Sequence, residues 1–100
     1  MLKAQGDGPG ALAAYRQSLA IREALAARDP ANTQWQVDVA VSCGKLGTLE
    51  HGQNVEVRRA YLLRGKTILA RLKSADRLMA NQDWTEWFAE QLQQLPPDRP

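Results

Sequence analysis

The chain has 100 residues, 44% hydrophobic and 24% charged, which allows one domain with a small hydrophobic core. Its formal net charge of +2 is too small to indicate a nucleic-acid-binding protein by itself. The single cysteine excludes an internal disulfide framework, and no apolar run approaches the roughly 20 residues that span a membrane, so we expect a cytoplasmic protein.

The first predicted helix covers residues 9–29. Leu12, Tyr15, Leu19 and Leu25 recur at helical spacing along one of its sides, within an alanine-rich segment that favours helix. Pro30 ends this helix, because proline disfavours helical geometry in the residue before it.

The second predicted helix covers residues 34–50, with Thr33 and Gln36 interpreted as a capping box at its start. Its apolar residues lie on two sides, since Val39 and Cys43 belong to one face and Val41 to another. A helix that is apolar on two sides is expected between other helices. We therefore predict an interior element.

The third predicted helix covers residues 55–80 and has one apolar seam. Gly65 interrupts this seam, where it allows either close packing or a bend. A fourth helix is predicted over residues 83–95, with Asp83 and Glu86 as its capping box.

The fourth helix carries three aromatic residues at the spacing of a buried face: Trp84, Trp87 and Phe88. The alternative is an aromatic binding box, which ranks below a buried face. We expect these three to close the core, while Glu86, Glu90 and Gln93 face water. The proline-rich tail, residues 96–100, is expected to be extended or disordered.

Residues of the first two helices recur in the last two at a nearly fixed offset. Tyr15 matches Tyr61 at an offset of 46 residues, and Ile21 matches Ile68 at 47. Trp35 matches Trp84 at 49. Recurrence of this kind in a fixed order indicates an internal repeat.

The recurring residues resemble the tetratricopeptide repeat (TPR) family, in a long-helix bacterial variety. The resemblance is strong over residues 6–47 and weak over 52–92, where Arg64 and Gly65 stand in place of Ser18 and Leu19. The residues that carry it are Gly6-Asp7, Ser18-Leu19, Ile21, Asp29-Pro30, Asn32, Trp35-Gln36, Asp38, Ser42 and Lys45-Leu46-Gly47.

The TPR resemblance implies an all-α fold of antiparallel helix pairs. We expect a truncated α-solenoid of about four helices over residues 1–95, in which residues 1–5 are the end of a preceding helix. It also implies a non-enzymatic protein-interaction or assembly module, within or beside a larger bacterial protein.

Two partner-binding surfaces are predicted on this scaffold. Because the first helix has no preceding mate, Leu12, Tyr15 and Leu19 are expected to form an exposed apolar strip. A protein partner, upstream repeats of a larger chain or a second copy of the chain would cover this strip.

The second predicted surface is a groove. In TPR folds the first helix of each pair lines the concave groove, which implies Asp38, Ser42 and Lys45 as groove residues and the fourth helix as a second wall. The paired Lys and Asn residues that would clamp a C-terminal carboxylate are absent from these helices.

A basic stripe on the third helix supports a second hypothesis. Arg59, Lys66 and Lys73 are seven residues apart and Arg77 continues their face, as in a surface that binds nucleic acid or an acidic ligand. The competing interpretation is a solvated face, which we favour because no aromatic residues interleave with the cations. Nucleic acid therefore ranks below a protein partner.

No catalytic, cofactor or metal site is predicted. One cysteine and one histidine are too few soft ligands for zinc. Cys43 lies on an apolar helix face and is expected to be buried and structural, while His51 is expected at a helix end. An enzyme therefore ranks third, after a protein-interaction module and a protein that binds nucleic acid or an acidic ligand.

Overall fold

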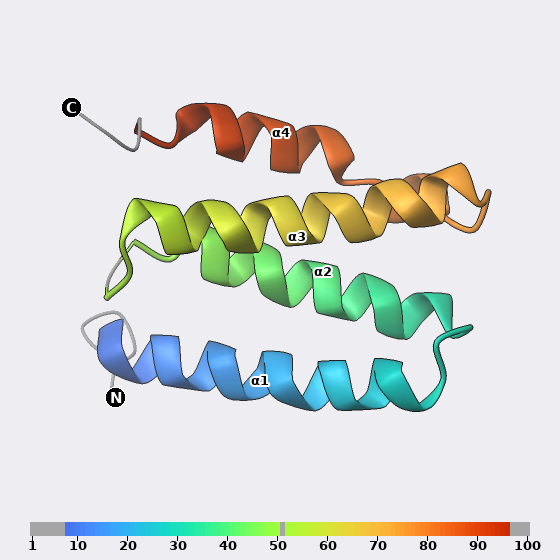
Figure 1. The fold of residues 1–100 in the computed structure, drawn as a ribbon, viewed down its shortest axis with the longest axis horizontal. Helices are drawn as coiled ribbons and strands as arrows, with labels where there is room; N and C mark the ends of the chain where they lie inside the picture. The colour runs from blue at the N-terminus through green and yellow to red at the C-terminus, as the bar shows by residue number, and fades with distance from the viewer. Residues whose placement is uncertain (1–7, 51, 97–100) are drawn as a thin grey trace.

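The computed structural model describes residues 8–50 and 52–96, and this part of the chain is all-α, as predicted (Figure 1). Its helices lie side by side in chain order, each antiparallel to the one before. No strand occurs among the described residues. The elements are α1 (Gly8–Arg28), α2 (Thr33–Thr48), α3 (Val55–Ser74), the short 3-10 turn η2 (Ala80–Gln82) and α4 (Thr85–Gln94).

α2 begins one residue earlier than predicted, because its N-cap is Asn32. The Asn32 side-chain oxygen accepts a hydrogen bond of 3.0 Å from the backbone N–H of Trp35, which satisfies one of the free donors of the first turn. The predicted capping box is wrong, since Thr33 is already helical and the Gln36 side chain donates to the carbonyl of Pro30.

α3 ends at Ser74, six residues before its predicted end. Asp76 adopts a left-handed backbone conformation with φ of 59°, and the N–H of Arg77 turns back to the carbonyl of Leu72 at 2.9 Å. The apolar seam therefore does not continue as helix beyond this point, and Met79 is 65% exposed.

α4 begins at Thr85, with Trp84 in the N-cap position. The Asp83 carboxylate accepts hydrogen bonds from the backbone N–H and the hydroxyl of Thr85, at 3.1 and 2.6 Å. The predicted capping box of Asp83 with Glu86 is therefore wrong, because the N-cap is Trp84, one residue after Asp83. Residues 97–100 of the predicted disordered tail, and residues 1–5 of the predicted preceding helix, lie outside the described residues.

α2 is the interior helix that its two apolar sides predict. Val39, Cys43 and Leu46 pack with Leu19 and Ala26 of α1 in one cluster. A second cluster joins the other side of α2 to α3 and α4 and consists of Val37, Ala40, Leu62, Leu69, Leu72, Phe88 and Leu95.

The strip of Leu12, Tyr15 and Leu19 is not an exposed surface, so that prediction is wrong. Leu19 is only 6% exposed, and the half-buried Leu12 and Tyr15 pack against the α1–α2 cluster. The reason is that α2 itself covers this side of α1. The exposed large apolar residue of α1 is Ile21, at 57%.

Glycines allow α2, α3 and α4 to pack closely. A Cβ atom on Gly65 would lie 2.5 Å from the Phe88 ring, and one on Gly47 would lie 2.5 Å from Leu62. α3 runs on as helix through Gly65. Of the two alternatives for this glycine, the contact with Phe88 supports close packing.

Candidate functional site

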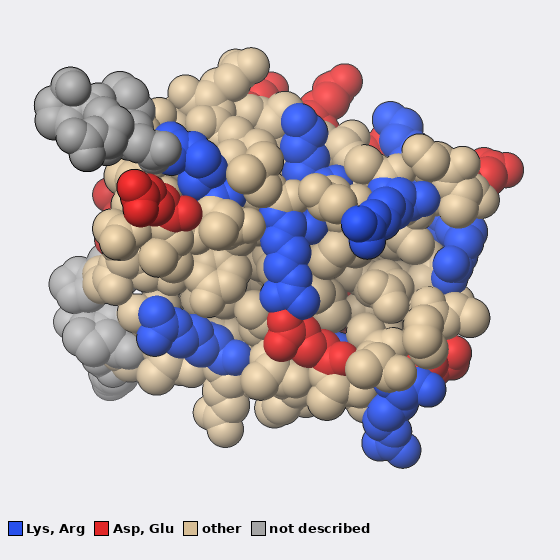
Figure 2. Space-filling model, viewed as in Figure 1, with Lys and Arg blue, Asp and Glu red and all other residues tan. Residues whose placement is uncertain are grey.

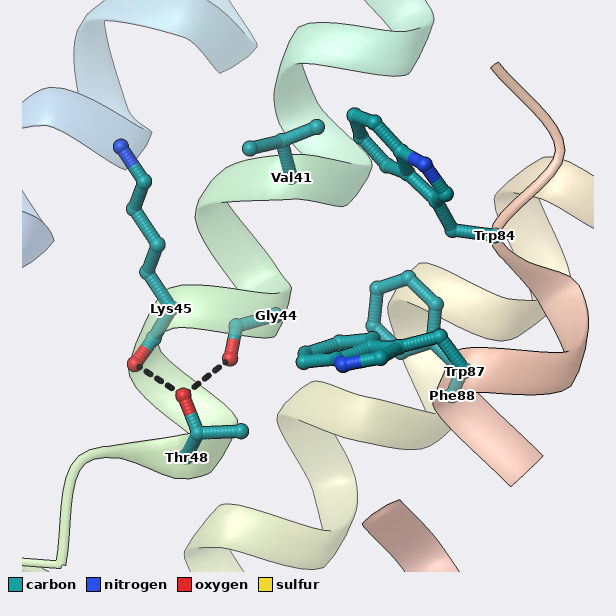
Figure 3. Close-up of a pocket in the computed structure, with 7 residues that line it drawn as sticks. All are labelled: Val41, Gly44, Lys45, Thr48, Trp84, Trp87 and Phe88. Carbon is teal, nitrogen blue, oxygen red and sulfur yellow. Dashed lines mark hydrogen bonds between the residues drawn. The ribbon is translucent and has the colours of Figure 1, made fainter. Parts of the chain in front are cut away.

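A pocket of about 290 Å³ opens between α2 and α4 (Figure 3). Its surface is almost wholly apolar, and its residues come from the second half of α2 and the start of α4. It is lined by Val41, Gly44, Lys45, Thr48, Trp84, Trp87 and Phe88.

Phe88 and Gly44 determine the shape of this pocket. Phe88 is 1% exposed, and Trp87 packs against it edge to face, with ring centroids 4.9 Å apart and an interplanar angle of 86°. A Cβ atom on Gly44 would lie 3.1 Å from both Phe88 and Trp87. The missing side chain thus lets the two rings approach α2 and leaves a hollow beside them.

The two tryptophans are substantially exposed, at 42% for Trp84 and 39% for Trp87. The prediction of a buried aromatic face is therefore correct for Phe88 and wrong for both tryptophans. Glu86, Glu90 and Gln93, on the other side of α4, are exposed as predicted. Sequence reasoning ranked an aromatic binding box at these three residues below a buried face, and it did not use the glycine within α2 as a signal for a pocket.

Lys45 stands at the edge of the pocket. Its side chain leaves α2 on the side away from the two tryptophans and points toward α1 (Figure 3). It is exposed and has no ion-pair partner in the part of the chain that the structure describes. The hydroxyl group of the neighbouring Thr48 is engaged, since it donates to the carbonyls of Gly44 and Lys45 at 2.9 and 3.2 Å.

The three predicted groove residues do not form one site. Only Lys45 lines the pocket between α2 and α4. Asp38 lies at a separate hollow beside α1 and accepts a hydrogen bond of 2.9 Å from Gln34. Ser42 is 5% exposed, so its prediction as a groove-lining residue is wrong: this position of α2 is covered.

The basic stripe is not a continuous free face, because three of its four members bind other parts of the chain. Arg59 donates to the carbonyl of Pro96 at 3.0 Å, and Lys73 forms an ion pair of 2.9 Å with Asp83. Arg77 lies beyond the end of α3 and donates to Ala31 in the α1–α2 connection and to Thr33 at the start of α2. The fourth member, Lys66, is half-buried.

Charges of both signs occur on the face that Figure 2 shows, where Lys and Arg side chains are spread over the surface with acidic groups among them. One contact between them joins α3 to α1, through Arg64 and Glu23. At the start of α4, hydrogen bonds from Thr85 and Lys73 lower the pKa of Asp83 to about 2, so this carboxylate is ionised around neutral pH.

Cys43 is fully buried in the α1–α2 cluster, and this burial raises its thiol pKa to about 11. A buried, protonated thiol does not serve as a nucleophile, which supports the structural interpretation of Cys43. His51 lies outside the described residues.

Among the described residues, no group of three or more His, Cys, Asp or Glu side chains is placed to hold a metal ion. No helix in the same part of the chain combines the length and apolarity needed to cross a membrane.

Comparisons with protein-family models, with curated proteins and with solved structures found no match to this chain. The geometry of the α2–α4 pocket is therefore the starting point for its function.

Proposed function

We propose that this chain is a non-enzymatic, cytoplasmic protein-interaction module of TPR type, and that its α2–α4 pocket binds a segment of a partner protein. The observation that carries the proposal is the pair of exposed tryptophans, Trp84 and Trp87, on one apolar pocket. Tryptophan is enriched among the residues that supply most of the binding energy at protein interfaces.

Packing within the chain holds two of the aromatic side chains at the pocket. Phe88 is fixed between Gly44 of α2 and Gly65 of α3, and Trp87 packs on its ring. A partner segment therefore does not have to order these aromatic side chains when it binds, which lowers the entropic cost of association.

The TPR-like repeat is consistent with the location of the pocket. In that fold the first helices of successive pairs line the concave groove, and the Trp35–Trp84 match assigns α2 and α4 to this role. The matched residues Tyr15 and Tyr61 are also alike in their surroundings, since both are half-buried against the α1–α2 cluster.

The nucleic-acid alternative loses its main support. The hypothesis requires the stripe cations to be available to phosphates, whereas Arg59, Lys73 and Arg77 are bonded within the chain. We therefore retain a protein segment as the proposed ligand.

The test is selection of a displayed random-peptide library against the full chain, followed by fluorescence titration of the enriched peptides. Binding is expected to shift tryptophan emission to shorter wavelength, because Trp84 and Trp87 leave water. Trp87→Ala is expected to weaken binding about 5- to 30-fold, the range for a loss of about 1–2 kcal/mol.

Ile21→Ala is the matched control, because Ile21 is exposed on α1 and does not line the pocket. Circular dichroism of each variant checks that the helices are retained. The proposal is refuted if no peptide is enriched, or if the enriched peptides bind Trp84→Ala and Trp87→Ala as tightly as the unmodified chain.

A further inference from the structure

We infer, on the basis of the proposed function, that the bound segment inserts one bulky apolar side chain between Trp84 and Trp87. We also infer that it carries an acidic side chain, within two residues of the first, that pairs with Lys45. The apolar pocket and the exposed Lys45, which has no ion-pair partner among the described residues, together define this class of ligand.

The lining of the pocket requires an apolar group. Its surface is almost wholly apolar, with Val41, Trp84 and Trp87 among its lining residues, and the Thr48 hydroxyl is engaged with the helix backbone. A polar side chain placed here would lose its hydrogen bonds to water without replacement. At about 290 Å³ the pocket is at the lower end of the sizes typical of ligand pockets, so it suits a side chain rather than a folded surface.

Lys45 provides the charge that the ligand complements. Two acidic groups are engaged elsewhere: Asp38 accepts from Gln34, and Asp83 is held by Lys73 and Thr85. Glu86 at the start of α4 is exposed, and no ion pair joins it to Lys45 among the described residues. Complementary charge at the edge of an apolar contact contributes selectivity more than affinity. An acidic residue in the ligand is therefore the expected partner of this ammonium group.

The geometry also places the acidic residue relative to the apolar one. Lys45 lines the edge of the pocket, and its side chain points toward α1, across α2 from the tryptophans (Figure 3). The bound segment therefore crosses α2. Two residues of extended chain span about 7 Å, and the flexible side chains of the acidic residue and of Lys45 add to this reach. Because a single cation lines the pocket, we assign it an acidic side chain rather than a terminal carboxylate.

The experiment compares peptide selection on three forms of the chain: unmodified, Lys45→Gln and Lys45→Glu. The unmodified chain is expected to enrich peptides with a bulky apolar residue and Asp or Glu one or two positions away. Lys45→Gln is expected to keep the apolar preference and lose the acidic one. Lys45→Glu is expected to enrich Lys or Arg at the same position.

Affinities are then measured with enriched peptides that are acetylated and amidated, so that no terminal charge contributes. Replacing the acidic residue by its amide is expected to weaken binding about two- to fivefold, as for an exposed ion pair, and less at high salt. The same replacement in the peptide is expected to leave its affinity for the Lys45→Gln variant unchanged. Lys66→Gln, a lysine on α3 outside the pocket, is the matched control and should behave as the unmodified chain.

The possible outcomes separate this inference from the proposed function. Peptides that depend on Trp87 but show no acidic preference, or an equal acidic preference with Lys45→Gln, overturn the inference and leave the proposed function standing. If no enriched peptide depends on Trp84 or Trp87, both are overturned. Peptides that bind only with a free C-terminal carboxylate also overturn the inference.

Discussion

Gly65→Ala tests the close packing of α3 against α4 beneath the pocket. The added Cβ atom would lie 2.5 and 2.6 Å from two carbon atoms of the Phe88 ring, about 1 Å closer than an ordinary carbon–carbon contact. The ring has little room to move, because it is 1% exposed and Trp87 packs on it. On α2 the carbonyl oxygen of Ala40 lies 3.1 Å from the same Cβ position, which limits movement of α3.

The net change in the free energy of unfolding caused by Gly65→Ala follows from two opposing effects. Replacing glycine by alanine within a helix stabilises it by about 1 kcal/mol. Overpacking a closed core costs about 1–3 kcal/mol, and the rigid surroundings of Phe88 place Gly65→Ala in the upper half of this range. We therefore expect the free energy of unfolding to fall by about 1–2 kcal/mol.

Urea denaturation followed by far-ultraviolet circular dichroism measures this change, with the m-value as a check that unfolding remains two-state. Phe88→Leu provides the matched background, because it removes the ring atoms that the new methyl group would contact. In that background Gly65→Ala is expected to have no cost or to stabilise by up to about 1 kcal/mol. A Gly65→Ala single variant as stable as the unmodified chain would show that Phe88 is not held against Gly65.

Two other predictions concern residues away from the pocket. Arg77→Ala is expected to lower the free energy of unfolding by about 1 kcal/mol, because it removes the hydrogen bonds to Ala31 and Thr33 that tie the chain after α3 to the α1–α2 connection and the start of α2. Arg71→Ala is its control in the same urea assay, and an equal loss would contradict the prediction. Cys43 is expected to resist a thiol-labelling reagent at pH 8 and to react only in urea, because its thiol is fully buried with a pKa of about 11. Rapid labelling of the folded chain would mean that α1 does not cover this face of α2.

The positions of the four α-helices were predictable because each has an apolar stripe at helical spacing. Their ends were less predictable, since they depend on which of several suitable residues acts as the cap. Asn32 and Thr33 are both good N-caps, and Asn32 is used. α3 ends early with Asp76 in a left-handed conformation that more commonly belongs to glycine. Nothing in the local sequence indicates that Arg77 bonds to a loop more than 40 residues earlier.

The candidate site was predicted only in part, because its burial pattern depends on tertiary packing. The spacing of Trp84, Trp87 and Phe88 on one side of a helix predicts that all three are buried. The contact surface of α4 is narrower than this, since only Phe88 lies close to both Gly44 and Gly65. Likewise, the apolar face of α1 was predicted correctly, but the element that covers this face, α2, was not.

Gly44 links the packing of the fold to the proposed binding site. Its missing side chain lets Phe88 approach α2 and leaves open the space that Trp87 borders, since a Cβ atom there would contact both rings at 3.1 Å. Glycine is otherwise unfavourable within a helix, by about 1 kcal/mol relative to alanine. An alanine at this position would strengthen α2 as a helix while reducing the pocket. The glycine therefore favours the close approach of Phe88 and Trp87 to α2 over the helix propensity of α2 itself.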